Sequence, residues 1–151
     1  MSLTDTTDRA ILNRIQSHFP ITPQPYLSIA NDLGLTEAEV IERIRRLKEN
    51  GIIRRIGANF IPNKLGFVST LCAARVPEDK IDSFADAINR CPGVTHNYQR
   101  DHEFNIWFTF IAPSMEEIDN NLQSISRETG ISDIISLPAT KTYKIKAKFD
   151  L

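Results

Sequence analysis

Long hydrophobic runs, clustered cysteines and a strong excess of charge of either sign are all missing from this sequence of 151 residues. No apolar stretch approaches the roughly 20 residues that a transmembrane helix needs. Residues 1–5 lack the basic start and the apolar stretch of a signal peptide. The sequence therefore predicts a cytoplasmic protein that has no membrane partner.

The two cysteines, Cys72 and Cys91, are far apart in the sequence and have no CxxC spacing. Cys72 lies in an apolar run, which favours a buried thiol over a metal ligand. A four-iron cluster needs about four thiolates, and one copy of this chain cannot supply them. The cysteine content therefore argues against cluster-dependent radical chemistry.

The usual catalytic signatures are absent as well. The sequence has no GxSxG, P-loop, GxGxxG or HExxH motif, so the common hydrolase, nucleotide-binding and zinc-protease classes are not indicated. The net charge is −1, whereas a nucleic-acid-binding protein usually has a basic excess, at least locally. His18, at the end of the first predicted helix, is interpreted as a capping or surface residue.

The first part of the chain predicts a helical domain. Apolar residues recur at helical spacing over three segments, residues 5–17, 26–33 and 37–49. Thr36 and Glu39 have the spacing of a capping box at the start of the third segment. The β-branched segment 52–60 then predicts a strand or a hairpin arm. Three helices followed by such an arm indicate a winged helix-turn-helix domain, with predicted bounds 1–61.

The remaining residues, 62–151, alternate strand and helix patterns. β-Branched and apolar segments predict strands at 65–76, 94–100 and 104–112, and a final strand pair at 134–137 and 142–149. Helical spacing predicts helices at 78–89 and 114–129. The order β-α-β-β-α-β is that of a ferredoxin-like domain, so we predict an α+β protein of two domains.

A helix-turn-helix raises the possibility of DNA binding. A recognition helix reads bases from its N-terminal residues, which here include Glu37 and Glu39, with Glu42 one turn later. Carboxylates near the phosphate backbone oppose the main electrostatic source of affinity. Residues 1–60 contain eight Lys and Arg against seven Asp and Glu. A DNA-binding transcriptional regulator is therefore only the alternative function, and DNA is not an expected partner.

The densest group of functional side chains lies at residues 95–107, around the turn between two predicted strands. Side chains alternate along a strand, so His96, Tyr98 and Arg100 share one face. Histidine transfers protons near neutral pH, and arginine binds carboxylates through two hydrogen bonds. Each residue alone has a plainer interpretation, as a packing, turn or solvated side chain. Together they suit an anionic, carboxylate-bearing ligand that receives a proton.

The chain resembles two families at two levels of detail. Over nearly its whole length it is similar to the Lrp/AsnC regulators, through residues 5–12 and 47–58. A narrower resemblance is to the sirohaem (siroheme) decarboxylases of the Ahb and Nir type, and within them to the AhbA type of subunit. The residues that carry it are 15–16, 19–20, 51–58, 92–98, 100–102, 105–109, 137–141 and 143–145.

The resemblance implies an enzyme, a carboxy-lyase that converts sirohaem to 12,18-didecarboxysirohaem and CO2 in the alternative haem biosynthesis pathway. It also implies a heterodimer or higher hetero-oligomer with a homologous second subunit of the AhbB type. No cofactor beyond the iron tetrapyrrole substrate is implied, and no separate metal site. A non-catalytic subunit that only completes its partner's pocket is a further alternative.

The resemblance also implies which residues form the site. The pattern His96-x-Tyr98-x-Arg100 matches the motif that the family shares, and His102 belongs to the form typical of this subunit. His96 and His102 are both candidates for the proton donor and for the ligand to the substrate iron. Further substrate contacts are expected from Arg54, Arg55, Asn97, Asn105, Trp107, Lys141 and Lys144. Lys141 departs from the family pattern, in which we expect an arginine, so bidentate geometry is lost there.

Overall fold

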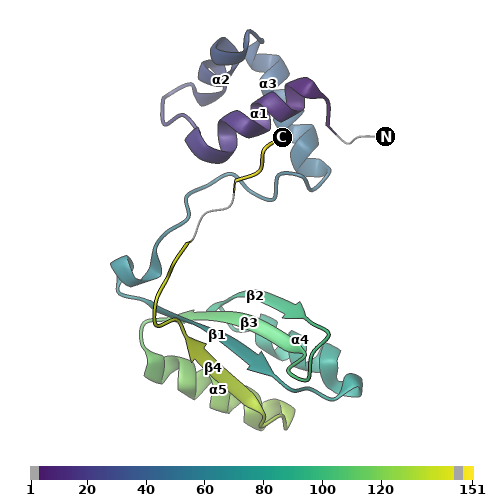
Figure 1. Cartoon of the computed structure of the whole chain (residues 1–151), viewed down its shortest axis with the longest axis vertical. Helices are drawn as coiled ribbons and strands as arrows, with labels where there is room; N and C mark the ends of the chain where they lie inside the picture. The colour runs from purple at the N-terminus through teal and green to yellow at the C-terminus, as the bar shows by residue number, and fades with distance from the viewer. Residues whose placement is uncertain (1–3, 145–147) are drawn as a thin grey trace. The chain divides into compact units, whose positions relative to one another are not determined.

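The computed structural model describes residues 4–144 and 148–151, and it divides into two compact units (Figure 1). The helical unit contains residues 4–58 together with 144 and 148–151. The sheet unit contains residues 59–143. Each unit has a hydrophobic core of its own.

The helical unit contains the three predicted helices, α1 (Thr6–His18), α2 (Pro25–Leu33) and α3 (Glu37–Glu49). The Asp5 carboxylate accepts a hydrogen bond from the backbone N–H of Asp8, and the Asp8 carboxylate accepts one from the backbone N–H of Asp5. α1 therefore begins with a capping box. Thr36 caps α3 by accepting a hydrogen bond from the backbone N–H of Glu39. The helix-turn-helix prediction is therefore confirmed, and its core consists of Ile11, Ile29, Ala30, Val40, Ile44, Leu47 and Ile53.

The predicted strand or hairpin arm at 52–60 was wrong, since these residues form no strand. The backbone N–H groups of Ile52 and Ile53 both donate to the carbonyl of Leu47 at the end of α3. Ile53 is buried in the helical core. The β-branched side chains that suggested a strand therefore serve as packing for the helices, and the first two amides of the segment are used by the helix end.

The sheet unit has the predicted order β-α-β-β-α-β. Its four antiparallel strands stand in the order β2-β3-β1-β4. They are β1 (Val68–Ala74), β2 (Val94–Gln99), β3 (Ile106–Ala112) and β4 (Ile134–Pro138). The helices α4 (Ile81–Asn89) and α5 (Met115–Thr129) pack on one face of this sheet, and short 3-10 turns precede β1 and α4 (Figure 1).

The predicted last strand at 142–149 was also wrong for the residues that the structure describes. Residues 142–144, 148 and 149 form no strand, and residues 145–147 lie outside the described ranges. Instead, the backbone of Phe149 pairs with the side-chain amide of Gln16 on α1, through hydrogen bonds of 2.8 and 2.9 Å. The C-terminal residues thus satisfy part of their backbone hydrogen bonding on a helix and not in a sheet.

The sheet has one covered and one open face, and a β-bulge decides which side chains of β2 lie on each. Val94 pairs with Phe110 of the covered face, but the register shifts before His96, which pairs with Thr109. Because of this shift His96 and Tyr98 lie on the open face. In a strand with regular pairing, His96 would instead pair with Phe108 and lie on the same face as Val94.

Cys72 lies on the covered face and is fully buried. Burial raises the pKa of its thiol to about 11. The prediction of a buried thiol is therefore confirmed.

A buried carboxylate joins α1 to α3. Asp8 is 1% exposed, and both of its oxygens accept hydrogen bonds of 2.8 Å from Arg46, with a third bond of 2.9 Å from Arg43. Removing this carboxylate leaves the arginines without their shared acceptor. Asp8→Ala should therefore lower the free energy of unfolding by about 2 kcal/mol, the usual range for hydrogen bonds to charged groups.

Urea denaturation measures this effect, with Glu42→Ala as the control. Glu42 forms an exposed ion pair with Arg45, and exposed pairs contribute about 0.5 kcal/mol. Equal losses in the two variants would contradict the role given to Asp8.

Candidate functional site

The predicted row of side chains on β2 is present on the open face of the sheet. The rings of His96 and Tyr98 are stacked, with centroids 6.1 Å apart and an angle of 24° between them. The Arg100 guanidinium lies 5.9 Å from the centroid of the Tyr98 ring. All three side chains are exposed. The prediction that His96, Tyr98 and Arg100 lie together is confirmed, and the row offers flat rings beside a guanidinium cation.

In the turn after β2, the side chains of His102 and Trp107 both form hydrogen bonds with the backbone of Phe104. The backbone N–H of Phe104 donates to Nδ1 of His102 over 3.1 Å, and Nε1 of Trp107 donates to the carbonyl of Phe104 over 2.6 Å. The rings of His102 and Trp107 also meet edge to face, 6.5 Å apart. Trp107 and His102 therefore fix the shape of the turn that carries Arg100.

Asn105 fixes the same turn from the other side. Its carbonyl oxygen accepts from the backbone N–H of Val76 over 2.9 Å, and its amide donates to the Val76 carbonyl over 2.8 Å. This pair of bonds ties the end of β1 to the start of β3. Asn97 lies on the covered side of β2, opposite Phe108, and its amide donates to Asn89 of α4. The structure therefore places both asparagines in contacts within the chain.

A polar cavity of about 510 Å³ opens at this end of the sheet. Arg100 and His102 line it, whereas His96 and Tyr98 do not. The residues around it are Glu78, Ile81, Gln99, Arg100, Asp101, His102 and Asn105. Glu78 was not predicted as a site residue, because only the packing of the turn before α4 near the hairpin brings it to the cavity. The predicted site is thus divided between an open aromatic face and an end cavity, and Arg100 belongs to both.

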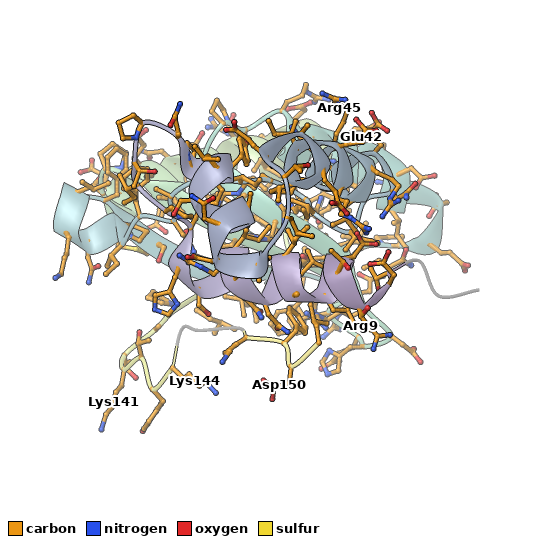
Figure 2. All side chains as sticks on the ribbon, turned by 90° about the horizontal axis from the view of Figure 1, so that it is seen from above. Arg9, Glu42, Arg45, Lys141, Lys144 and Asp150 are labelled. Atoms are coloured by element: carbon orange, nitrogen blue, oxygen red, sulfur yellow. The ribbon has the colours of Figure 1, made fainter. Side chains whose placement is uncertain are left out.

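The other predicted contact residues lie elsewhere. Arg54 and Arg55 belong to the helical unit. Lys141 and Lys144 follow β4 and extend into solvent (Figure 2), and Nζ of Lys141 lies 4.9 Å from the centroid of the Tyr143 ring.

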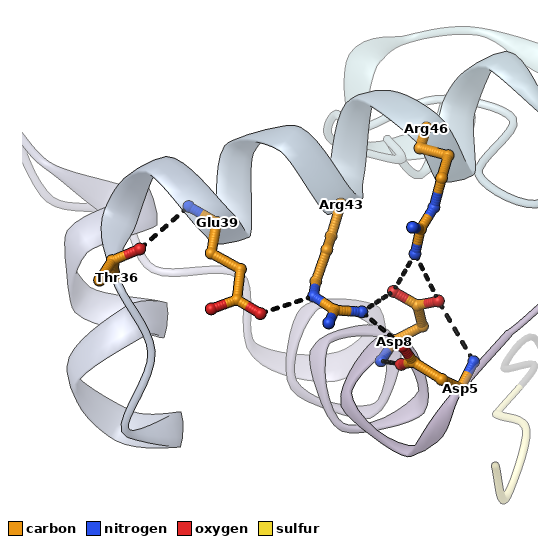
Figure 3. Close-up of polar contacts among 6 residues, drawn as sticks. All are labelled: Asp5, Asp8, Thr36, Glu39, Arg43 and Arg46. Atoms are coloured by element: carbon orange, nitrogen blue, oxygen red, sulfur yellow. Dashed lines mark hydrogen bonds and ion pairs between the residues drawn. The ribbon is translucent and has the colours of Figure 1, made fainter.

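The cations of the recognition helix are largely bound within the unit (Figure 3). Arg43 forms ion pairs with Asp5, Asp8 and Glu39, and Arg46 pairs with Asp8. Hydrogen bonding to the Arg43 guanidinium lowers the pKa of the Asp5 carboxyl. These arginines are therefore held by carboxylates of α1 and of their own helix, which weakens the electrostatic basis for phosphate binding.

The described residues contain neither a cluster of metal-binding side chains nor a membrane-spanning helix. Within residues 4–144 and 148–151, no three His, Cys, Asp or Glu side chains are grouped so that they could hold a metal ion. None of the helices in those ranges is long and apolar enough to span a membrane.

Two protein families match the chain. The family described as "AsnC-like ligand binding domain" matches residues 64–144, and the "Siroheme decarboxylase NirDL-like HTH domain" matches residues 8–54. The "Siroheme decarboxylase alpha subunit" of Desulfovibrio desulfuricans is 54% identical to the chain, over 96% of the chain and 83% of that protein. The "Siroheme decarboxylase NirD subunit" of Pseudomonas aeruginosa is 38% identical, over 97% of each.

Solved structures are similar as well. The siroheme decarboxylase NirDL, solved in co-complex with an iron-uroporphyrin III analogue, is 32% identical with a TM-score of 0.66, over 91% of this chain and 47% of that one. AsnC of Escherichia coli has a TM-score of 0.80 at 18% identity, over 97% of this chain and 99% of that one. The AsnC likeness shows the fold alone.

The position of Asn105 gives a test of the turn. Asn105→Ala leaves the N–H and C=O of Val76 without these partners, so it should lower the free energy of unfolding by about 1–3 kcal/mol. Asn97→Ala is the control. The Asn97 side chain donates to the exposed Asn89, so this change should alter stability by less than about 0.5 kcal/mol. Chemical denaturation of the two variants measures the difference, and a larger loss in Asn97→Ala would refute the assignment.

Proposed function

The chain belongs to the siroheme decarboxylase family, and on this premise we propose that it is one subunit of an enzyme that converts sirohaem to 12,18-didecarboxysirohaem and CO2 in the alternative haem pathway. The observation that carries the proposal is the row of His96, Tyr98 and Arg100 on the open sheet face. It combines a proton-transferring group, a hydroxyl and a cation that binds carboxylates.

The substrate chemistry suits this row. Sirohaem is a flat iron macrocycle that carries many carboxylates on its edge. The stacked rings of His96 and Tyr98 offer a flat surface, and Arg100 can bind an acetate through its two parallel N–H groups. Tyr98 would donate a hydrogen bond to a carboxylate. Trp107, half-buried beside the row, would form part of an apolar wall that favours loss of charge from the reacting acetate.

The reaction needs protons but no oxidant. Protonation of the pyrrole carbon next to the acetate creates an electron-poor ring. The C–C bond to the carboxylate then breaks, CO2 leaves, and its electron pair forms an exocyclic double bond. A second proton adds to that methylene to give a methyl group, and the ring carbon loses the first proton. Each acetate therefore consumes one proton and releases one CO2, and two acetates react.

The two histidines would take different roles. Because the Phe104 amide donates to Nδ1 of His102, the neutral ring of His102 has its proton on Nε2. In this neutral form Nε2 donates a hydrogen bond and presents no lone pair to a metal. To deliver a proton the ring would first become an imidazolium, and its Nδ1–H would then release the bond from Phe104. In His96, Nδ1 lies 3.1 Å from the Thr95 hydroxyl, which can accept its N–H and leave Nε2 free to bind. His102 is thus the proposed proton donor, and His96 the proposed ligand to the substrate iron.

The remaining residues have supporting roles in this proposal. Arg54, Arg55, Lys141 and Lys144 would bind further carboxylates of the substrate. Asn97 and Asn105 would act by positioning the hairpin, given their bonds within the chain. We also propose a homologous second subunit, because relatives are named as alpha, NirD and NirDL subunits. Its AhbB type, like the cytoplasmic location, is a prediction from the sequence.

The alternative function is that of an Lrp/AsnC-type regulator. The fold supports it, but the recognition helix does not. Arg43 and Arg46 are held by carboxylates, and Arg45 pairs with Glu42.

A second alternative is a subunit that only completes its partner's pocket. It would be indicated if single substitutions at His96 left turnover intact.

Loss of the cation in the row should stop the reaction. Arg100→Ala should reduce CO2 release from sirohaem by a factor of about 100 or more under anaerobic conditions, since a bidentate anchor orients the acetate. Arg127→Ala, an exposed arginine on α5, is the matched control and should keep full activity. Mass spectrometry of the product measures the outcome. Full turnover by Arg100→Ala would contradict the site proposed on this sheet face.

The histidine roles make separate predictions. His96→Ala should abolish the shift of the Soret band that follows iron ligation, whereas His102→Ala should keep the shift and lose CO2 release by a factor of about 100 to 10,000. His102→Gln retains an N–H near the position of Nε2, so it should bind substrate as the unchanged chain does. A lost Soret shift in His102→Ala, with a normal one in His96→Ala, would reverse the assignment.

A further inference from the structure

Arg75 follows β1 directly and contacts two other segments at the end of the sheet that carries the hairpin turn. Its Nη2 lies 3.1 Å from the carboxylate of Glu103, in the turn after β2, and its Nε lies 3.2 Å from the carboxylate of Asp133, before β4. Its guanidinium carbon lies 5.3 Å from the centroid of the Phe104 ring. Two nitrogens of one planar group thus pair with two carboxylates, which restricts its orientation beside the phenyl ring.

Arg75 and Val76 together contact three consecutive residues of the hairpin turn. Arg75 contacts Glu103 and Phe104, and the backbone N–H and C=O of Val76 bind the side chain of Asn105. The segment after β1 is therefore attached to the turn both through a side chain and through its backbone. A substitution at Arg75 removes only the first of these attachments.

The Phe104 ring also stacks on the ring of His102. The two centroids are 6.5 Å apart, with an angle of 25° between the planes. The backbone of Phe104 contacts the same imidazole, because its N–H donates to Nδ1 of His102. The position of Phe104 therefore decides the orientation of the His102 ring, and Arg75 is the charged group that lies beside Phe104.

The contacts of Arg75 contribute little to folding. The side chains of Arg75, Glu103 and Asp133 are 53%, 62% and 49% exposed. Ion pairs between exposed side chains contribute little to stability, and an exposed cation beside an aromatic ring contributes a similarly small amount. The arrangement thus affects the position of the Phe104 ring more than the free energy of unfolding.

A proton donor needs an orienting contact that survives its own change of charge. The hydrogen bond from the Phe104 N–H needs the lone pair on Nδ1 of the neutral His102 ring, and an imidazolium has no such lone pair. Stacking on the Phe104 ring requires no lone pair, and an aromatic face also attracts a cation. The stack is therefore the contact that can orient His102 in both of its protonation states.

We propose that Arg75 is a positioning residue for His102, because it holds the Phe104 ring on which the imidazole stacks. The inference rests on the proposed function for the reaction that His102 serves, whereas its effect on the ring belongs to the free chain. A catalytic group must be held within about 10–20° of its productive orientation. Arg75 acts through Phe104 and has no contact with the substrate in this proposal.

The first test separates turnover from binding, with the full chain and its second subunit. Arg75→Ala should lower kcat for CO2 release from sirohaem by about tenfold to a hundredfold, the effect of a misplaced catalytic group. The Kd for iron-uroporphyrin III, measured from the Soret band, should change by less than about twofold. Arg75→Lys keeps a cation that can lie beside Phe104 and should recover most of the lost kcat.

The matched control is Arg90→Ala. Arg90 lies in the same unit and forms an exposed ion pair with Glu128, and it has no contact with the hairpin turn among those that the described residues show. Its loss should change neither kcat nor Kd. Equal losses of kcat in Arg75→Ala and Arg90→Ala would overturn the proposal.

A double-mutant cycle tests the route through Phe104. Phe104→Leu should lower kcat at least as much as Arg75→Ala does, because it removes the stack itself. Adding Arg75→Ala to Phe104→Leu should then change kcat by less than about twofold, since residues that act through one contact are not additive. Fully additive losses would show that Arg75 acts by another route, and the proposal would fail.

NMR of the free chain measures the ring without any turnover. The chain has three histidines, so the ring signals of His102 are identified by their loss in His102→Gln. In Arg75→Ala these signals should move towards those of an unstacked imidazole, because the ring current of Phe104 no longer acts on them. Arg75→Lys should reverse most of this shift, and Arg90→Ala should leave the signals in place.

The outcomes separate this inference from the proposed function. Unchanged His102 signals in Arg75→Ala would overturn the inference, whatever happens to kcat. A Kd that weakens in step with kcat would make Arg75 a substrate contact and would also overturn it. If the His102 signals move as expected while the unchanged chain with its second subunit releases no CO2 from sirohaem, the positioning of the ring stands and the decarboxylase function fails.

Discussion

The extra residue at Thr95 in strand β2 determines which face of the sheet carries the reactive side chains. Val94 packs into the core beneath the sheet, and after the bulge His96 and Tyr98 lie on the open face. With regular pairing, His96 and Tyr98 would lie on the covered face opposite Phe108 and Ile106, where Asn97 and Gln99 lie now. The row with Arg100, and every role proposed for it, depends on this one irregularity.

Around that strand the chain uses side-chain-to-backbone hydrogen bonds to hold a turn that has no regular structure. His102 and Trp107 bind the N–H and the carbonyl of Phe104, and Asn105 binds both groups of Val76. Several residues of the dense 95–107 segment are thus needed to shape the site as well as to act in it. These bonds hold the backbone of the turn that follows Arg100, although the hairpin is small and exposed.

The sequence predicted local features well and non-local ones poorly. The cap at Thr36, the three helices and the β-α-β-β-α-β order follow from short-range patterns, and all are present. The strand predicted at 52–60, and the one predicted at 142–149 as far as its residues are described, were wrong because β-branched residues favour a strand only where another strand is available to pair. The shared face of His96, Tyr98 and Arg100 was predictable from alternation. The bulge, the contacts of Asn105 and the approach of Glu78 were not, because they arise from packing between distant segments.

A helix-turn-helix fold does not by itself imply DNA binding. In α3 the arginines hold α1 through the buried Asp8, so much of the positive charge of this helix is paired within the unit.

The central claim is that the chain decarboxylates an iron tetrapyrrole. The most direct test is anaerobic incubation of sirohaem with the purified chain and its second subunit, followed by mass spectrometry of the tetrapyrrole and measurement of CO2. The account predicts a product that lacks two carboxyl groups and two CO2 released per sirohaem. Unchanged sirohaem, together with salt-dependent binding of the chain to its own promoter DNA, would contradict it.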